Sequence, residues 1–302
     1  TLGGFTSLLI LGLISLFLLY RGFSVLRSEG FGFITDYEWV SSINSDGTVG
    51  EVASTYGVGA MLAGTIVTAI IALVIGAPIS ILAALYLAFY APVRTRKFLV
   101  SVVDLMAAFP SILFGLWGLN VLMDQGIYFA ELLNRYLGWI PIFQVPVPVF
   151  LRSPFIAGLV LAIMIIPIVT AVSREIFSQT PLDRIQAAYA LGATKRETCT
   201  GVIFPAALSG IIAAGVIAMS RAIGETTIVL LAAGSTANFS FDIGQPMQTM
   251  SSFIGFAGLG DQPTGSTGYQ TIFAVGSLLF VVTFILNMLS RRIVSRFREV
   301  YE

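Results

Sequence analysis

The stretch QAAYALGATKRETCTGVIFP, residues 186–205, decides the fold of this chain because it places a short polar segment between two long apolar runs. Just before it, Thr180 suits a helix N-cap and Pro181 suits the first helical position. Within it, Gly192 can adopt the left-handed conformation that ends a helix. The tetrapeptide Thr-Lys-Arg-Glu at 194–197 has the spacing of a capping box for a second helix. The stretch therefore predicts a compact helix–turn–helix and not a flexible linker.

Composition places this helix–turn–helix in a membrane protein. The chain has 302 residues, of which 56% are hydrophobic and only 11% are charged, and its mean hydropathy is +0.91. A soluble domain needs roughly 25% charged residues to cover its surface. The lipid bilayer must therefore cover much of this chain.

The counts of charged residues, histidine and cysteine give no support to nucleic-acid binding, a metal site or an internal disulfide. Basic and acidic residues both number 16, so the net charge gives no indication of nucleic-acid binding. Histidine is absent and Cys199 is the single cysteine, which predicts no metal site and no internal disulfide. We expect Cys199 to be a packing residue.

Six uncharged runs are long enough to cross a bilayer, for which a helix needs about 20 apolar residues. The second run is interpreted as one long helix that protrudes from the membrane, with a kink at Pro78. Pro205 is expected to mark the turn into the fifth span. The chain is therefore predicted to be an all-α polytopic membrane protein with six transmembrane helices. The runs cover residues 1–20, 52–93, 105–123, 153–173, 198–220 and 262–290.

The distribution of arginine and lysine predicts the orientation, because cytoplasmic loops carry an excess of these residues. With six spans, eleven basic residues fall in one set of loops and four in the other, which places both termini in the cytoplasm. The segments 21–57, 136–154 and 235–268 then lie outside, and the prolines of 136–154 argue against a helix there. The cytoplasmic set comprises Arg94, Arg96, Lys97, Arg174, Arg184, Lys195, Arg196, Arg291, Arg292, Arg296 and Arg298. The other set comprises Arg21, Arg27, Arg135 and Arg152.

Two charged residues, Arg221 and Glu225, interrupt the fifth span, which we expect to run over about 206–233. An arginine at the bilayer centre costs about 2.5–3.5 kcal/mol by insertion scales, so the pair should face the bundle interior, one helical turn apart. One interpretation is a buried ion pair that fixes helix packing. The other is an oxyanion site, because a guanidinium offers a planar fork of donors to phosphate or sulfate and Thr226 adds a hydroxyl.

The stretch 186–205 also resembles the signature of bacterial ABC importer permeases, Glu-Ala-Ala-x3-Gly-x9-Ile-x-Leu-Pro. The signature positions here are Gln186, Ala187, Ala188, Gly192, Val202, Phe204 and Pro205. Two changes are mild apolar swaps, whereas Gln186 replaces the family's glutamate and so shifts the expected contact from ionic to hydrogen-bonded. In the family this helix sits in a groove of the ATPase subunit. The resemblance therefore implies that these residues couple the chain to an ATPase, with Ala187 and Ala188 allowing close approach.

The stretch SRAIGET at 220–226 resembles the Arg-Ala-[Ile/Leu]-Gly-Glu-Thr segment of phosphate permeases. Sulfate and molybdate permeases carry a similar Arg-x-x-Gly-Glu, usually followed by Phe or Tyr, so Thr226 favours phosphate. Further resemblance to PstC-type phosphate permeases lies at 109–118, at 164–175 and in the C-terminal tail at 290–302. The resemblance covers nearly the whole chain and favours the PstC type over its paralogue PstA.

The resemblance implies the type I ABC importer (MetI-like) permease fold. Its parts would be a first transmembrane helix and extracytoplasmic loop at 1–57, a permease core at 58–290 with coupling helices at about 181–204, and a cytoplasmic tail at 291–302. The chain would lie in the bacterial cytoplasmic (inner) membrane. Its partners would be a PstA-like permease, a PstB-like ATPase dimer and an extracytoplasmic PstS-like phosphate-binding protein.

We expect no catalysis and no cofactor in the chain itself. No Gly-x4-Gly-Lys-[Ser/Thr] phosphate loop occurs in the sequence, so ATP and Mg would be bound by the partner ATPase. Asp104, about seven residues into the third span, is either an interfacial acid whose side chain snorkels or an element of a cytoplasmic gate. Rival functions are a permease for sulfate, molybdate or tungstate, an ion-driven anion carrier or channel, and a non-transporting membrane scaffold.

Overall fold

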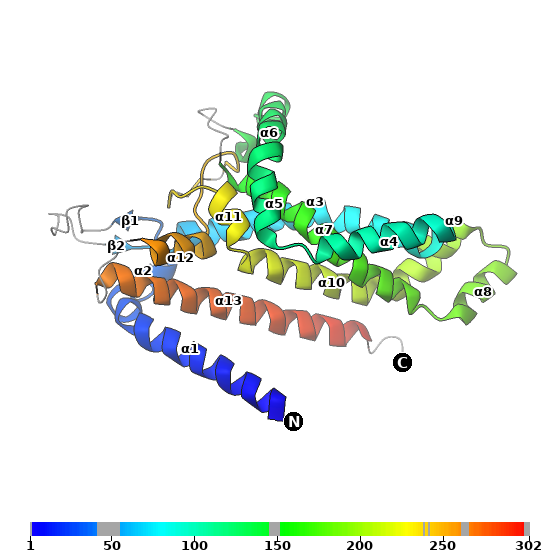
Figure 1. Cartoon of the computed structure of the whole chain (residues 1–302), viewed down its shortest axis with the longest axis horizontal. Coiled ribbons are helices and arrows are strands. Elements are labelled where there is room, and N and C mark those ends of the chain that lie inside the picture. Colours follow the sequence, from blue (N-terminus) through cyan, green and yellow to red (C-terminus); the bar gives the residue numbers. More distant parts are fainter. Residues whose placement is uncertain are drawn as a thin grey trace. The chain divides into compact units, whose positions relative to one another are not determined.

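The computed structural model describes residues 2–40, 55–144, 152–237, 239–240, 242–260 and 266–298, and most of these are helical (Figure 1). The helices are α1 (Leu2–Glu29), α2 (Gly32–Thr35), α3 (Gly59–Leu85), α4 (Val93–Ala107), α5 (Ser111–Trp117), α6 (Met123–Leu137), α7 (Pro154–Ser178), α8 (Leu182–Ala190), α9 (Lys195–Thr198), α10 (Phe204–Gly224), α11 (Thr227–Ala232), α12 (Met250–Leu259) and α13 (Thr267–Arg298). Between them lie the π-helical turns η1 (Tyr86–Tyr90), η2 (Gly118–Leu122) and η4 (Cys199–Ile203) and the 3₁₀ turn η3 (Pro141–Phe143). The short strands β1 (Trp39–Val40) and β2 (Thr55–Tyr56) pair antiparallel.

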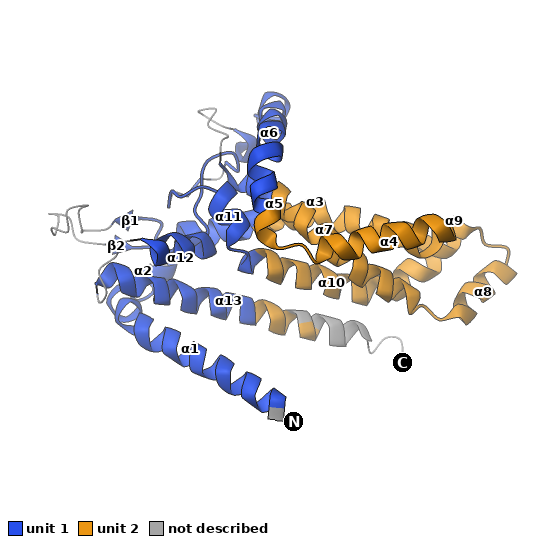
Figure 2. Ribbon diagram, in the orientation of Figure 1, with its two compact units in different colours: residues 1–68, 115–158, 223–284 blue, residues 69–114, 159–222, 285–302 orange. Residues whose placement is uncertain are grey.

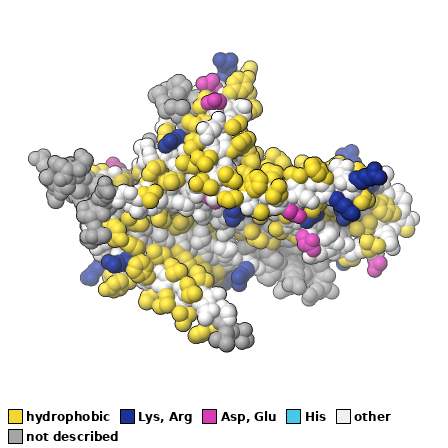
Figure 3. Space-filling view, in the orientation of Figure 1, with side chains coloured by type: hydrophobic (Ala, Val, Ile, Leu, Met, Phe, Trp, Pro, Cys, Tyr) yellow, Lys and Arg dark blue, Asp and Glu magenta, His cyan; other side chains and the backbone are white. Residues whose placement is uncertain are grey.

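Six helical runs in the described part of the chain are long and apolar enough to cross a membrane, which confirms the predicted number of spans. A helix satisfies its backbone hydrogen-bonding groups internally, as the lipid interior requires. Figure 3 shows many hydrophobic side chains on the visible surface, with Lys and Arg side chains gathered near α4 and α9. The runs are Gly3–Glu29, Gly59–Tyr90, Ser111–Leu137, Pro154–Ser178, Lys195–Gly224 and Thr267–Leu289.

The long second run forms one span, as predicted. α3 begins at Gly59 and passes through Pro78 without ending, and η1 extends it to Tyr90. Buried hydroxyls on this helix find acceptors on the helix itself. Thr65 Oγ1 donates to the carbonyl of Met61 at 2.7 Å, so it leaves no unpaired donor in an apolar setting.

The third span differs from the prediction. It covers Ser111–Leu137 instead of 105–123. Pro110 accounts for the difference, because proline lacks a backbone N–H and disfavours the α conformation in the residue before it. α4 therefore ends at Ala107. Asp104 consequently lies on α4, a separate helix with no buried residue, and not inside the third span.

The segments predicted to lie outside the membrane contain more structure than expected. Between α6 and α7 the described residues hold the 3₁₀ turn η3 and no α-helix, as the prolines predicted. In contrast, the 235–268 segment contains the apolar helix α12, whose Met250 N–H donates to Thr65 Oγ1 of α3 at 3.0 Å. Other parts of the predicted outer loops, at 41–54, 145–151, 238, 241 and 261–265, and residues 299–302 of the predicted tail, lie outside the described residues.

The chain divides into two compact units, which are coloured separately in Figure 2. Unit 1 comprises residues 1–68, 115–158 and 223–284, and unit 2 comprises residues 69–114, 159–222 and 285–302. The core of unit 1 includes Val25, Met61, Met250, Phe253 and Val275. The core of unit 2 includes Ala84, Phe177, Cys199, Ile203, Ala207 and Ile211. The buried thiol of Cys199 is thus part of the packing, as expected.

Gly22 allows α1 to approach α13 closely inside unit 1. A Cβ atom at Gly22 would lie 2.8 Å from both the Cα and the N atom of Ala274. These are backbone atoms, which cannot rotate away as a side chain would. Phe17 adds an edge-to-face contact with Phe273, with ring centroids 5.6 Å apart.

We predict that Gly22→Ala lowers the thermal stability of the purified protein. Steric overlap with the α13 backbone costs about 1–3 kcal/mol, which exceeds the gain of at most about 1 kcal/mol from replacing a helical glycine by alanine. Gly12→Ala is the matched control, because no atom lies within 4 Å of a Cβ there. The unfolding midpoint in detergent should fall for Gly22→Ala and stay level or rise for Gly12→Ala. Equal midpoints would contradict the close helix contact.

Candidate functional site

The predicted helix–turn–helix is present at 182–198. α8 begins one residue later than expected, because Pro181 has an extended ψ of 129° and precedes the first helical residue, Leu182. Thr180, predicted as the N-cap, therefore lies outside the helix. Gly192 has a φ of +82°, the left-handed conformation predicted for the residue that ends this helix.

A capping box begins the second helix, as predicted. The N–H of Thr194 donates to Glu197 Oε2 at 2.7 Å, and the N–H of Glu197 donates to Thr194 Oγ1 at 3.3 Å. Thr194 Oγ1 also donates to the same carboxylate oxygen at 2.7 Å. Two backbone donors that a bare helix end would leave unpaired are thus satisfied. The turn between α8 and α9 therefore has a defined geometry.

α8 leaves its surface open to a partner. None of its residues is buried, and Leu182 and Leu191, at its two ends, are 66% and 89% exposed. Gln186 and Ala187 are exposed and Ala188 is half-buried. Two adjacent alanines allow another protein to approach the helix backbone, while the leucines offer apolar surface. The geometry is therefore suited to docking.

The second helix continues directly into the fifth span. α9, η4 and α10 form one helical run, Lys195–Gly224, so the prediction that Pro205 marks a turn is wrong. Pro205 is the second residue of α10 and follows η4. The i→i+5 bonds of a π-turn widen the helix at the place where proline supplies no N–H donor. The capping box and Arg221 consequently lie on one helical run.

Arg221 lies in the last turn of α10 with its side chain exposed. It belongs to unit 2, whose boundary with unit 1 falls after Ala222. α10 ends at Gly224, a residue with low helix propensity. Glu225 is therefore the first residue after the helix that carries Arg221, and the prediction that both residues lie on one helix is wrong. The fifth span also ends earlier than predicted, because α11 is a separate short helix.

Glu225 is held by contacts inside unit 1. It is 9% exposed, and its Oε1 accepts a hydrogen bond from the N–H of Thr227 at 3.2 Å. Its backbone carbonyl accepts a hydrogen bond from Ser251 Oγ at 2.7 Å. The Glu225 carboxylate thus binds a backbone N–H at the start of α11, where a negative charge is favourable. Its backbone carbonyl is hydrogen-bonded to α12. Thr226, which follows, is exposed. The roles of these residues in transport stay predictions.

Asp104 forms an ion pair with Arg174 of α7 inside unit 2. Asp104 Oδ1 and Arg174 Nη2 lie 3.9 Å apart, and the two side chains are 53% and 25% exposed. An exposed pair of this kind contributes about 0–1 kcal/mol, so it can open at little cost. The contact is compatible with both interpretations of Asp104, an interfacial acid and a gate element.

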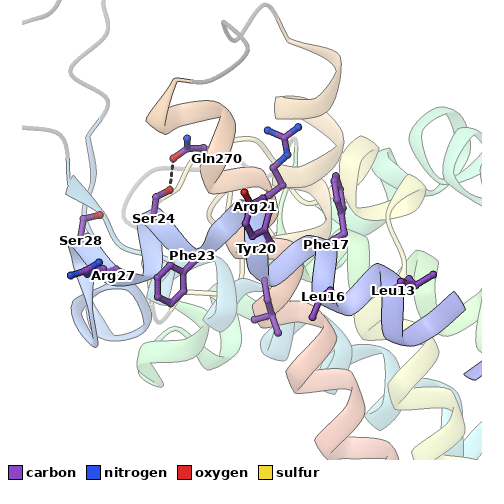
Figure 4. Close-up of a pocket in the computed structure, with 11 residues that line it drawn as sticks. Leu13, Leu16, Phe17, Tyr20, Arg21, Phe23, Ser24, Arg27, Ser28 and Gln270 are labelled. Carbon is purple, nitrogen blue, oxygen red and sulfur yellow. Dashed lines mark hydrogen bonds between the residues drawn. The ribbon is translucent and has the colours of Figure 1, made fainter. Parts of the chain in front are cut away.

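A cavity of about 1410 Å³ along α1 contains none of the predicted site residues (Figure 4). Leu13, Leu16 and Phe17 line its apolar part, and Ser24 donates a hydrogen bond to Gln270 of α13 at its polar end. α1 is a candidate span, and most of its apolar side chains are exposed. We therefore interpret this cavity as surface for lipid or a neighbouring helix and not as the cargo site.

A buried acid, Asp242, lies between α11 and α12. It is 4% exposed, and its Oδ1 accepts the N–H of Gly244 at 2.9 Å. Its Oδ2 has no hydrogen-bond partner within the described residues. Burial raises the pKa of Asp242, and the hydrogen bond from the N–H of Gly244 opposes the rise. Sequence reasoning missed this residue because its burial depends on distant parts of the chain, such as Phe155 of α7.

We predict that Asp242→Asn stabilises the protein at pH 7. The raised pKa means that folding favours the protonated acid, so ionised Asp242 reduces stability as the pH rises above the unfolded-state pKa of about 3.9. Asparagine removes the charge and keeps an oxygen for the N–H of Gly244. The unfolding midpoint should exceed that of the wild type at pH 7, and the difference should shrink towards about pH 4. Asp124→Asn, at an exposed position, is the control. A difference that does not change with pH would contradict the prediction.

Comparison with known proteins identifies a family and close relatives. Residues 76–297 match the family described as "Binding-protein-dependent transport system inner membrane component". The phosphate transport system permease protein PstC 2 of Mycobacterium tuberculosis is 37% identical over 297 residues, which cover 96% of this chain and 88% of that protein. The phosphate transport system permease protein PstC of Mycobacterium leprae is 38% identical over 286 residues, which cover 92% of this chain and 86% of that protein.

Solved structures of ABC transporters share the fold. The MetNI methionine ABC transporter, in an inward-facing conformation, has a chain that matches with a TM-score of 0.53 and 19% identity, over 80% of this chain and 94% of that chain. A bacterial ABC transporter involved in alginate import matches with a TM-score of 0.51 and 17% identity, over 77% of this chain and 78% of that chain. At these identities the likeness concerns the fold alone, and it confirms the predicted MetI-like permease fold.

Proposed function

Because the chain belongs to the family of binding-protein-dependent transport system inner membrane components, we propose that it is the permease subunit of an ATP-driven phosphate importer. Relatives named as PstC phosphate permeases match more than nine-tenths of the chain, and six spans offer a membrane path. The observation that carries the proposal is the helical run Lys195–Gly224. It leads from the capping box after α8 to Arg221, and so would join a docking segment to a charge in the membrane.

In this proposal α8 is the docking element for a separate ATPase that binds ATP and Mg. The exposed faces of Gln186, Ala187 and Ala188 would contact a groove of that subunit, with Gln186 forming a hydrogen bond in place of an ion pair. The left-handed Gly192 and the capping box would hold α8 in a fixed position relative to α9. A movement of the ATPase would therefore displace the fifth span and not be absorbed by the turn.

Arg221 would be the oxyanion-binding group of the path. Its exposed guanidinium has five N–H donors in a planar fork, which fits two phosphate oxygens at once. Thr226 is also exposed and would supply a hydroxyl, whereas the buried Glu225 would position the segment between α10 and α11. Asp104 would act at the α4–α7 end through its weak pair with Arg174.

The complete importer would contain a second permease, an ATPase dimer and an extracytoplasmic phosphate-binding protein. Both termini of this chain and α8 would lie in the cytoplasm of a bacterial cell, with the chain in the inner membrane. ATP binding would close the ATPase dimer and open the path outward, and hydrolysis would reset it. An ion-driven carrier would transport phosphate without the ATPase, and would leave the exposed signature on α8 without a role.

We predict that Arg221→Ala reduces ATP-dependent phosphate uptake by about tenfold or more, because a charge-assisted contact with the anion is lost. Arg221→Lys should retain part of the activity, since an ammonium keeps the charge but not the planar fork. Arg135→Ala, an exposed arginine on α6, is the matched control. The measurement is uptake of labelled phosphate into vesicles that contain the whole importer, with assembly checked by size-exclusion chromatography.

Full uptake by an assembled Arg221→Ala importer would remove Arg221 from the path. The same vesicles test the rival cargo. Uptake of sulfate, molybdate or tungstate in place of phosphate would favour a permease for another oxyanion. Uptake of phosphate without ATP would favour an ion-driven carrier.

We predict that Ala188→Glu releases or uncouples the ATPase, because a longer charged side chain blocks close approach to the α8 backbone. The control is Thr200→Glu, which adds the same charge at an exposed position that the signature leaves unconstrained. The readouts are the amount of ATPase that copurifies and the ratio of phosphate transported to ATP hydrolysed. If Ala188→Glu keeps both values and the spans remain folded, α8 is not the docking element.

A further inference from the structure

A cavity of about 420 Å³ lies inside unit 2, between η1, α4 and α7. Its volume is within the range of about 300–1,000 Å³ typical of small-ligand pockets. Leu87 and Phe89 of η1 contribute apolar wall, and α4 and α7 contribute the charged lining. The cavity lining contains neither Arg221 nor any residue of the α8 signature.

Three cations line this cavity, Arg96 and Lys97 from α4 and Arg174 from α7. The carboxylate in the lining is Glu175, so the lining carries a net charge of +2. Ser178 also lines the cavity, but its hydroxyl donates to the carbonyl of Glu175 at 2.7 Å and so has no hydrogen left for a phosphate oxygen. Cations from two different helices thus line one pocket, which is open to the surface through the exposed Arg96 and Lys97.

Arg96, Lys97 and Arg174 have N–H donors that no neighbouring carboxylate in the described part of the chain uses. Among the side chains that the structure describes, no carboxylate oxygen lies within 4.0 Å of Arg96 or Lys97. Arg174 meets Asp104 at 3.9 Å, which is longer than a hydrogen bond. A guanidinium carries five N–H donors, so Arg174 can keep this contact and still bind a ligand.

Arg96 and Lys97 belong to a cluster of like charges on α4. Together with Arg94 they place three cations within the first two turns of the helix. The first turn has no acidic residue, and the N-cap Pro92 makes no side-chain cap. The excess of basic residues in cytoplasmic loops explains why cations occur at the start of α4 and near the end of α7. It does not require them to converge with Arg174 on one cavity, whereas an anion in the cavity would offset their mutual repulsion.

We propose that this cavity is a second phosphate-binding site, separate from Arg221, in which Arg96, Lys97 and Arg174 bind the oxygens of a phosphate group. Two sources of that group fit the chemistry. One is inorganic phosphate that the importer has released on this side, which rests on the proposed function. The other is the headgroup of an anionic phospholipid in the adjacent leaflet. Released phosphate held here would slow further import and so link transport to the supply already inside.

The test compares the double variant Arg96→Gln/Lys97→Gln with the control Arg94→Gln, which changes a cation on the same helix that does not line the cavity. Vesicles that contain the whole importer receive ATP and increasing inorganic phosphate on the α8 side, and the initial rate of labelled phosphate uptake is measured. Uptake by the wild type and by the control should fall as trapped phosphate rises. In the double variant the half-inhibiting concentration should rise by about tenfold.

Native mass spectrometry of the purified importer separates the two sources. A phospholipid headgroup predicts bound anionic lipid in the wild type and the control, less of it in the double variant, and no inhibition by trapped phosphate. Equal inhibition and equal lipid retention in all three proteins would overturn the proposal. Loss of the ATPase from the double variant alone would also overturn it, because the cations would then serve docking.

The same measurements distinguish a failure of the second site from a failure of the proposed function. If the wild type takes up no phosphate even without trapped phosphate, the proposed function fails and the released-phosphate source fails with it. The lipid measurement would then still decide whether Arg96 and Lys97 hold a phosphate group. If uptake is normal and inhibition is unaffected by the double variant, with lipid retention unchanged, only the second site fails.

Discussion

The unbroken helical run from Lys195 to Gly224 is the constraint on which the functional arrangement depends. It begins in a capping box, passes Pro205 through the π-turn η4, and carries Arg221 in its last turn. In unit 2 its side chains Ile203 and Ala207 pack in one core with Phe177 of α7. In the proposed mechanism a helix anchored in this way would move as a body, so a force on α8 would reach the fifth span through the turn at 191–194. A flexible linker at the same place would absorb that force.

Local sequence signals predicted the parts of the structure that depend on neighbouring residues. The capping box at 194–197 and the left-handed Gly192 are properties of a few adjacent residues, and both are present. The six spans follow from apolar runs, because lipid imposes the same requirement on every helix. The predicted span boundaries were wrong at two prolines, because a proline can either end a helix or be accommodated inside one. Pro110 separates α4 from the third span, whereas Pro205 is accommodated inside a continuous helix.

The sequence predicted which residues belong to the candidate site but not how they are arranged in space. The spacing of Arg221 and Glu225 suggests one helix face, but α10 ends between them and Glu225 is bound by α11 and α12. The cavity beside Arg96 and Arg174 brings together residues far apart in the sequence, which no local pattern can indicate. Asp242 is a similar case, since a polar loop position becomes buried only through tertiary packing. The positions of helix ends and the long-range contacts, more than residue identity, determine where these side chains lie.

The most direct test of the account is the distance between spin labels at Leu191, after α8, and Ile217 of α10, both of which are exposed. It would be measured by pulsed electron paramagnetic resonance in the whole importer, without nucleotide and with ATP trapped. A rigid connection predicts one narrow distance distribution that is the same in both states, while uptake remains ATP-dependent. A shift of several ångströms between the states would place a hinge between Leu191 and Ile217 and contradict the rigid connection between the turn after α8 and the fifth span.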